Sequence, residues 1–350
     1  GDDMNTPTVL AAAIGGLVLL VMTSTVRGED FYQGQTLRLM VFGAPGGGYD
    51  TYTRMIARHI GQYIPGNPTT VVENMTGAGG LVLANYLYKR AEPDGLTIGT
   101  FNNSLIVQKA LGDPRIRMDF KKFGWIGAPS VGAPVCMVMG FTGLKTLEDV
   151  LNYDKPLKVG ATRAGSTGYD LPLIMNKTLG TQFEVVSGYT GTATTRIALQ
   201  KGELQAFCSQ WESMRVTARS MLDAEGDGKL IPFIISEGEW NDPEVKNLPT
   251  FKQAIRDPKK YAIYETWAFQ MDFQRAFCAP PGTPKERIEV LRAAWAKTMA
   301  DAELLKDAEK TKLIITPVSG EEVEKLVGQI LDMPADVRES LAFLVRKPKS

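Results

Sequence analysis

The stretch TLRLMVFGAPGGGYDTYTR, residues 36–54, decides how the first part of the chain folds. An aliphatic and aromatic run over 37–42 is typical of a strand, and apolar residues then recur at helical spacing from Tyr52 to Ile60. The glycine-rich sequence 43–48 lies between them. Glycines leave loop amides unobstructed, and the first turn of a helix has unpaired N–H groups and a partial positive charge. The stretch therefore predicts a strand, a tight loop and a helix whose N-terminus suits an anion.

The loop does not match the common nucleotide-binding patterns. A Walker A loop needs Gly-Lys-Ser/Thr where this chain has Gly48-Tyr49-Asp50, so the lysine and the magnesium-binding hydroxyl are missing. A dinucleotide-binding pattern started at Gly46 places Thr51 at its third glycine position. We therefore expect a small anion rather than a nucleotide. A plain turn that only joins the strand to the helix is the alternative.

Composition limits the classes of function. The 350 residues are enough for two domains, and 39 Lys and Arg balance 39 Asp and Glu, so no global charge favours nucleic acid or an anionic membrane. The single histidine, His59, and three widely spaced cysteines argue against a metal or redox site. We predict no catalytic residue, no metal and no cofactor. We interpret Cys136, Cys208 and Cys278 as small buried hydrophobic residues.

The N-terminal segment is typical of an export signal. Residues 9–22 form an apolar run that is short for a membrane span and suits the apolar core of a secretory signal. The signal is atypical, because no Lys or Arg precedes this run and Asp2 and Asp3 are acidic. We predict a signal peptide over residues 1–28 and a periplasmic location, with a retained single-helix anchor as the alternative.

The strand–loop–helix pattern repeats after the first helix. A strand over 69–73 leads into the small-residue loop 74–80, a helix follows over 81–88, and the turn 93–95 (PDG) leads into a strand over 96–101. This β-α-β-α-β order predicts parallel strands joined by right-handed crossovers. The two glycine-rich loops are then expected at one edge of one sheet.

Seven short motifs follow one another along the chain: 45–50 (PGGGYD), 72–80 (VENMTGAGG), 93–95 (PDG), 165–167 (GST), 188–192 (GYTGT), 202–206 (GELQA) and 279–284 (APPGTP). In this order they resemble the motifs of the substrate-binding proteins of tripartite tricarboxylate transporters, also called Bug or TctC-type receptors. The resemblance extends over nearly the whole chain after the expected signal. It implies an α/β protein with the two-lobed, type II periplasmic-binding-protein ("Venus flytrap") fold. It also implies that the lobes close on a carboxylate, which is delivered to membrane subunits of the transporter.

A second β-α series agrees with two lobes. Strands are predicted over 158–162, 183–186 and 204–208, and helices over 171–179 and 192–201. Segments without a helical period, which suit crossings between lobes, lie over 125–139 and 237–258. We therefore expect mixed, mainly parallel sheets flanked by helices, in a monomer whose lobe 1 comprises residues 29–128 and 250–350 and whose lobe 2 comprises residues 129–249.

The second lobe repeats the loop of the first. Residues 46–50 and 166–170 are both small-residue turns that end in Tyr-Asp before an apolar helix. If the lobes face each other, each presents a helix N-terminus to the cleft, and a carboxylate between them is held by amides and hydroxyls. We assign Asp50 and Asp170 to the first turns of their own helices, with Asp50 paired to Arg54, because a negative charge opposes an anionic ligand.

The expected ligand-binding residues come from these loops and from the resemblance. They are Pro45, Gly46, Gly47, Gly48, Tyr49, Gly77, Ala78, Gly79, Asn102, Gly165, Ser166, Thr167, Tyr189, Gly191, Thr192 and Trp211, with Arg163 and Gln210 as secondary candidates. Arg163 either supplies a full charge to a ligand carboxylate or is an exposed surface arginine, and we favour the surface position.

Two residues depart from the pattern of the resembled family. Tyr49 stands where a small hydroxyl residue is common, and Trp211 stands near the position of a common aspartate or asparagine. Aromatic rings at both places would narrow a pocket for citrate-like ligands and offer surfaces for stacking. We therefore expect an aromatic or longer apolar carboxylate, or a dicarboxylate. The alternative is that either ring belongs to the core.

Two other classes of function stay open. A ligand-sensing partner of a signalling receptor would use the same closure of lobes, and gene neighbourhood would separate it from a transport protein. An enzyme would need an activated nucleophile or an acid–base pair in the cleft, whereas the glycine-rich loops offer amides, hydroxyls and capping carboxylates. We predict a receptor that closes by a hinge motion at the two crossings.

Overall fold

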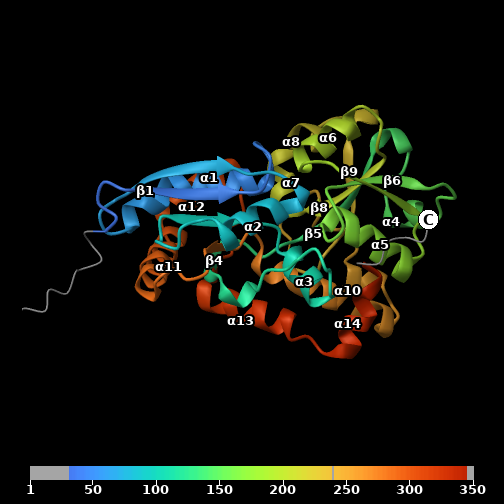
Figure 1. Cartoon of the computed structure of the whole chain (residues 1–350). Coiled ribbons are helices and arrows are strands. Elements are labelled where there is room, and N and C mark those ends of the chain that lie inside the picture. The colour runs from blue at the N-terminus through green and yellow to red at the C-terminus, as the bar shows by residue number, and fades with distance from the viewer. Residues whose placement is uncertain (1–30, 239, 345–350) are drawn as a thin grey trace, which may run out of the picture.

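The chain folds into two α/β lobes, each built on one β-sheet (Figure 1). This computed structural model describes residues 31–238 and 240–344, so the signal peptide expected over 1–28 lies outside the described residues. Among the described residues, no helix combines the length and the apolar character that a membrane span requires.

The first sheet has six strands in the order β11-β4-β10-β3-β1-β2. Its strands are β1 (Thr36–Val41), β2 (Thr69–Asn74), β3 (Thr97–Thr100), β4 (Gly124–Ala128), β10 (Phe277–Ala279) and β11 (Val318–Ser319). Because β1 is parallel to both β2 and β3, the glycine-rich loops after β1 and β2 lie at the same edge of the sheet, as predicted. β10 is antiparallel to its neighbours β3 and β4.

Helices cover both faces of this sheet. They are α1 (Gly48–Ile60), α2 (Leu81–Lys89), α3 (Ser104–Ala110), α11 (Lys285–Met299), α12 (Ala302–Thr311) and α13 (Gly320–Leu331). The apolar face of α1 is fully buried at Tyr52, Ile56 and Ile60, and it shares one core cluster with Leu39 of β1 and Leu291 of α11. This packing fixes the axis of α1, whose N-terminus follows the glycine-rich loop.

The second sheet has five strands in the order β7-β6-β8-β5-β9. Its elements are β5 (Pro134–Met139), β6 (Leu157–Ala161), β7 (Phe183–Ser187), β8 (Ala206–Gln210), β9 (Leu230–Ile235), α4 (Leu147–Leu151), α5 (Thr167–Leu179), α6 (Thr192–Gln200), α7 (Trp211–Thr217) and α8 (Arg219–Leu222). β6 is parallel to β7 and β8, while β5 is antiparallel to β8 and β9. Each sheet thus has a parallel β-α-β-α-β unit beside an antiparallel strand, β10 in the first sheet and β5 in the second, and the first sheet adds the antiparallel edge strand β11.

Short 3-10 turns complete the list of elements, at Gly61–Tyr63, Ala78–Gly80, Phe120–Lys122, Gly140–Thr142, Gly226–Gly228, Phe269–Phe273 and Ala342–Leu344.

Cys136 and Cys208 are buried, as interpreted, but they also form a disulfide with each other, which their spacing did not indicate. The antiparallel register of β5 and β8 places the two cysteines directly opposite each other. They are 72 residues apart in the sequence, so only the pairing of the strands brings them together. Cys278 is free and fully buried, and burial raises the pKa of its thiol well above the ordinary value, in agreement with the interpretation.

Two segments join the lobes and lie side by side. Residues 129–133 link β4 to β5, and the returning segment precedes β10. Ser130 and Gln274 form an antiparallel bridge, and the N–H of Gly132 donates to the carbonyl of Met271 at 2.7 Å. The two crossings therefore run as a short hydrogen-bonded pair between the lobes.

The chain returns to the first sheet later than its sequence suggested. Helices α9 (Phe251–Ala254) and α10 (Pro258–Ala268) come before the return, and α10 packs against α5 of the second lobe. Their aromatic side chains anchor them there: the rings of Phe251 and Tyr264 stack at 4.4 Å, and Trp267 is fully buried. The last helix, α14 (Ala335–Leu341), also contacts α10, as Figure 1 shows. The residue boundaries of the two lobes stay a prediction.

Candidate functional site

A cavity of about 100 Å³ lies between the two lobes. The first lobe lines it with Asn102 and with the loop after β1, and the second lobe lines it with the loops after β6 and β7 and with the end of β8. The returning crossing adds Gln274 and Arg275. Helices α1, α5 and α6 all have their N-termini at this cavity.

The loop of the first lobe presents free amides at the start of α1. Gly47 is the N-cap, and the N–H groups of Gly48 and Tyr49 donate to no group among the described residues. Asp50 turns back instead: it accepts the N–H of Gly46 at 2.9 Å and pairs with Arg54 at 3.0 Å, as predicted. Burial raises the pKa of Asp50, but these hydrogen bonds outweigh it and hold that pKa below its ordinary value. The carboxylate is therefore engaged by its own loop and helix.

The loop of the second lobe has the same construction at the start of α5. Ser166 is the N-cap, and the N–H groups of Thr167 and Gly168 have no acceptor among the described residues. Asp170 accepts the N–H of Gly165 at 2.9 Å and the indole N–H of Trp267 at 3.1 Å. In this way both predicted anion loops fold their own carboxylate away from the cavity.

Asp170 differs from Asp50 in lacking a bonded cation among the described residues. Burial raises its pKa to about 7, and the two N–H groups that it accepts and the charge of Arg163 offset this only in part. The carboxyl behind the second loop therefore titrates near neutral pH, whereas the one behind the first loop stays ionised.

The structure brings together many of the expected residues from both lobes. Those that line the cavity are Gly47, Gly48, Tyr49, Asn102, Ser166, Thr167, Gly191, Thr192 and Gln210. The others lie outside the lining. Pro45 and Gly46 are exposed at the tip of the first loop, and Gly165 is buried beneath the second. Tyr189 is half-buried and packs against the core of the second lobe.

Trp211 is a core residue, which corrects the expectation that its ring stacks on a ligand. The side chain is fully buried, and its indole N–H donates to Asp242 at 2.8 Å. The ring packs into the core of the second lobe, at the point where β8 ends and α7 begins. Tyr49 does line the cavity; its ring lies edge-on to Phe42 at 4.5 Å, and burial raises the pKa of its hydroxyl to about 12.

Arg163 reaches across the cleft instead of lying on the surface. Its guanidinium donates to Gln108 and, at 3.4 Å, to the carbonyl of Ala78, both in the first lobe. The side chain lies so close over Gly79 that a Cβ there would overlap it. Burial, with the nearby Arg115 charge, lowers the pKa of Arg163 to about 10. The loop 77–79 is thus occupied by a side chain of the opposite lobe and does not line the cavity.

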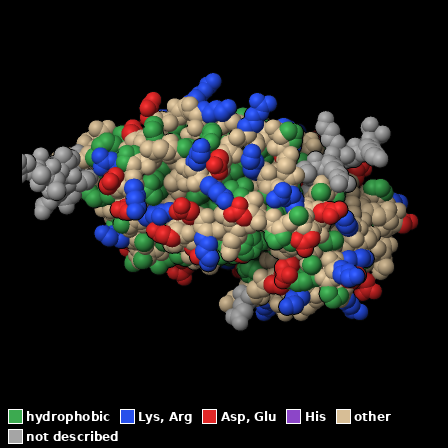
Figure 2. Space-filling view, turned by 60° about the horizontal axis from the view of Figure 1, so that its bottom comes forward, with side chains coloured by type: hydrophobic (Ala, Val, Ile, Leu, Met, Phe, Trp, Pro, Cys, Tyr) green, Lys and Arg blue, Asp and Glu red, His purple; other side chains and the backbone are tan. Residues whose placement is uncertain are grey.

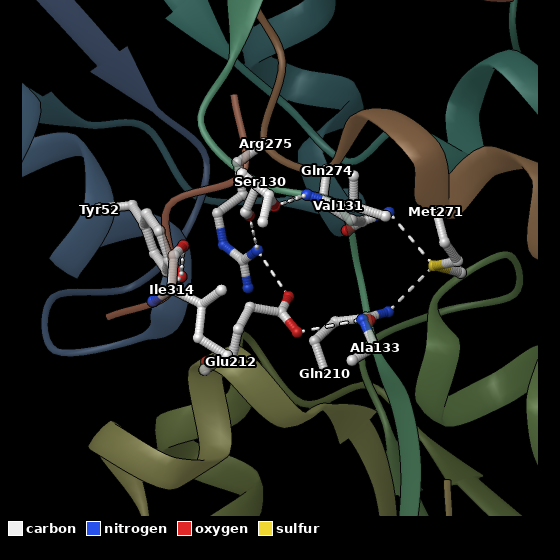
Figure 3. Close-up of polar contacts among 12 residues, drawn as sticks. Tyr52, Ser130, Val131, Ala133, Gln210, Glu212, Met271, Gln274, Arg275 and Ile314 are labelled. Carbon is white, nitrogen blue, oxygen red and sulfur yellow. Dashed lines mark hydrogen bonds and ion pairs between the residues drawn. The ribbon is translucent and has the colours of Figure 1, made fainter. Parts of the chain in front are cut away.

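Sequence reasoning missed a buried ion pair at the two crossings. Arg275, 2% exposed, donates to Glu212 at 2.7 Å and to the Ser130 hydroxyl at 3.1 Å (Figure 3). The second oxygen of Glu212 accepts the N–H of Ala133 at 3.1 Å. The guanidinium carbon also lies 4.5 Å from the ring centre of Tyr52. The pair therefore links both crossings to the second lobe. The sequence feature that could have indicated it is the lone charge in the apolar run 273–279.

Charges of both signs are mixed on the described surface. On the face in Figure 2, Lys and Arg are interspersed with Asp and Glu, so no patch of one sign covers that face. Within residues 31–238 and 240–344, no group of three or more His, Cys, Asp or Glu side chains is arranged to hold a metal ion.

Comparison with known proteins finds structural similarity. By sequence, no protein-family model matches the chain and no curated protein matches it. By structure, it is similar to the periplasmic binding protein BugD, with a TM-score of 0.71, 20% identity and coverage of 89% of this chain and 98% of that one. MatC from Rhodopseudomonas palustris with bound malate has a TM-score of 0.67 and 23% identity, over 87% of this chain and 99% of that one. An R. palustris protein with adipate has a TM-score of 0.71 and 19% identity, over 89% and 98%. The chain has the two-lobed α/β fold of periplasmic binding proteins.

Proposed function

We propose that this chain is a periplasmic solute-binding protein of the tripartite tricarboxylate transporter type, which captures a small organic carboxylate between its lobes. The observation that carries the proposal is the pair of helix N-termini, of α1 and α5, whose free amides line one cavity from opposite lobes. The order of the glycine-rich motifs and the fold shared with BugD and MatC support this family.

A carboxylate is the ligand class that these groups favour. Free amides at a helix N-terminus donate hydrogen bonds and have a partial positive charge, so they stabilise an anion. At about 100 Å³ the cavity has room for roughly seven to ten water-sized groups, which suits an acid of roughly ten non-hydrogen atoms. Malate and adipate, bound in two of the similar structures, are acids of this size class. An aromatic acid and a dicarboxylate both fit this description.

The lining of the cavity supports a receptor rather than an enzyme. Its side chains include no Asp, Glu, His or Lys. Cys208 is tied into the disulfide, and the Tyr49 hydroxyl, with its pKa raised to about 12, is a poor acid or base at neutral pH. These groups suit binding and release of a ligand without chemistry.

The disulfide supports a periplasmic location, because disulfides persist in oxidising compartments. We propose further that the protein is a monomer and that it passes its ligand to the membrane subunits of the transporter. Gel filtration tests the first point. Genes for a small and a large integral membrane subunit beside this one would support the second.

A thermal-shift panel tests the ligand class. Mono-, di- and tricarboxylic acids and aromatic acids are compared with an amine and a sugar as controls. A ligand at a hundredfold excess over its Kd stabilises the fold by about 2.7 kcal/mol, so a bound acid raises Tm by several degrees. The proposal is contradicted if every carboxylate leaves Tm unchanged while the amine or the sugar raises it.

A further inference from the structure

The guanidinium of Arg163 is held by all three of its nitrogens. Nε donates to the carbonyl of Ala164 at 3.2 Å, within the second lobe. The other two nitrogens cross the cleft: Nη1 donates to the carbonyl of Ala78 at 3.4 Å, and Nη2 donates to Oε1 of Gln108. One side chain of the second lobe therefore bonds to two separate segments of the first, the loop after β2 and helix α3.

Each lobe has a glycine where the side chain of the other lobe lies. Arg163 lies over Gly79 of the first lobe, and Gln108 lies over Gly165 of the second, each so closely that a Cβ on the glycine would overlap the side chain. Gln108 is 2% exposed, so its contact with Arg163 is shielded from water. Each lobe thus inserts one side chain into a gap on the other, and the two side chains bond to each other. This fit exists only while the lobes are together.

The energetics of the contact suit a bond that opens again. A charged donor makes a stronger hydrogen bond than a neutral one, which favours the contact. Against this, burial lowers the pKa of Arg163 to about 10, and its acceptors are neutral, so the charge loses solvation without gaining a carboxylate partner. Nε2 of Gln108 is buried without a hydrogen-bond partner among the described residues, which adds a second cost. Separation of the lobes returns both groups to water.

Arg163 also belongs to the loop that leads into the proposed ligand site. Its carbonyl accepts the N–H of Ser166 at 3.1 Å and the Ser166 hydroxyl at 2.8 Å. Ser166 is the N-cap of α5, whose first amides line the cavity. The Arg163 side chain is not part of that lining. It therefore fastens a cavity loop to the opposite lobe from outside the cavity.

We propose that Arg163 is a latch between the lobes: its bonds to Gln108 and Ala78 form when the lobes come together and slow their separation. The latch raises the population of the closed arrangement without touching a ligand. It therefore acts on how long a ligand stays and not on which ligand is chosen. The inference goes beyond the proposed function, because it holds whatever solute the cavity takes.

The rate of cross-linking across the cleft measures the closed population without any ligand. Ala44 of the first lobe faces Gly191 of the second, and a Cβ on Gly191 would lie 3.5 Å from the Ala44 Cβ, within the roughly 3.5–4.5 Å over which disulfides form. Gly191 has a φ of 175°, which any residue adopts. In the full chain with Ala44→Cys and Gly191→Cys, a low concentration of diamide oxidises the pair only while the lobes are together. The rate is then proportional to the closed population.

Arg163→Met in this background keeps the length of the side chain and removes its donors. The latch predicts that cross-linking becomes slower by about 5- to 30-fold. Adding Gln108→Leu should slow it no further, because both substitutions remove the same bond. Arg196→Met is the matched control and should leave the rate unchanged, since Arg196 bonds to Thr217 at 3.0 Å within the second lobe. Circular dichroism verifies that each variant is folded.

An unchanged rate in Arg163→Met overturns the inference. So does a faster rate, which would mean that the cost of burying the charge exceeds the gain from its bonds.

Dissociation of malate and adipate from the chain without the added cysteines gives a second measurement. Arg163→Met should speed dissociation by a similar factor and leave association unchanged, because the latch is not formed in the open protein that admits the ligand. Equal dissociation rates with and without the substitution would also overturn the latch. If neither acid binds, the proposed function fails, while the cross-linking rate still decides the role of Arg163.

Discussion

Gly48 is the residue whose substitution tests the closure of the lobes most sharply. It lies at the first turn of α1, and Ser213 of α7, in the opposite lobe, is packed directly against it. A Cβ on Gly48 would overlap the Ser213 hydroxyl and would lie 2.8 Å from the Ser213 Cβ. Gly48→Ala therefore forces the lobes apart at one point beside the cavity.

The expected effect follows from two opposing terms. Overpacking by one methyl group in a tight contact costs about 1–3 kcal/mol, here only when the lobes are together. Alanine also favours the helix by up to about 1 kcal/mol, whether the lobes are open or closed. Gly48→Ala should thus weaken ligand binding by about 5- to 150-fold, while the ligand-free protein melts at an equal or slightly higher temperature.

Calorimetric titration and thermal melting measure the two terms separately. Gly328→Ala is the matched control, because Gly328 lies within helix α13 and a methyl group added there would meet no other atom within 4 Å. Ser213→Gly added to Gly48→Ala removes the overlapping atoms and should restore most of the affinity. The reasoning is refuted if Gly48→Ala binds the ligand as tightly as the wild type. It is equally refuted if the free energy of unfolding of the ligand-free protein falls by as much as the binding free energy, since the overlap would then destabilise the protein without its ligand as well.

Three further predictions concern other residues. Because burial raises the pKa of Asp170 to about 7 from its ordinary value of 3.8, the folded state binds this proton more tightly than the unfolded state; this contribution to stability is complete below about pH 4 and is lost as pH rises through 7. A nearby ligand anion raises that pKa further, so affinity should fall between about pH 6 and pH 8, and Asp170→Asn should remove this dependence in calorimetric titrations. Breaking the bond between Cys136 and Cys208, which are 72 residues apart, with a reductant during urea unfolding should lower the free energy of unfolding by about 2–4 kcal/mol; an unchanged midpoint would argue against the bond. Trp211→Phe removes the hydrogen bond to Asp242 and should cost about 1–2 kcal/mol of stability without changing affinity; a loss of affinity alone would return the ring to the site.

The first lobe could be predicted from the sequence because glycine-rich loops mark the ends of its strands. The strand predicted over 37–42 is β1, Thr36–Val41, and the helix after the loop begins at Gly48. The pairing of Asp50 with Arg54 followed from helical spacing alone. Local signals were sufficient wherever a residue and its partner lie within one strand–loop–helix unit.

Long-range partners could not be predicted in the same way. Cys136 and Cys208 meet only through the register of β5 and β8, and no local spacing encodes that register. Trp211 follows β8 directly, and alternation along a strand does not say which side faces the cleft. Arg275 reaches the cavity because the chain returns to the first lobe beside its first crossing. A lone arginine in the apolar run 273–279 was the signal to follow, because a buried charge needs a partner.

A crystal structure of the full chain grown with adipate or malate tests the central claim most directly. The account predicts the acid in the cavity between the lobes, with carboxylate oxygens within about 3 Å of the free amides of Gly48 or Tyr49 on one side and of Thr167 or Gly168 on the other. An acid ordered elsewhere on the protein, with these amides bonded only to water, would contradict it.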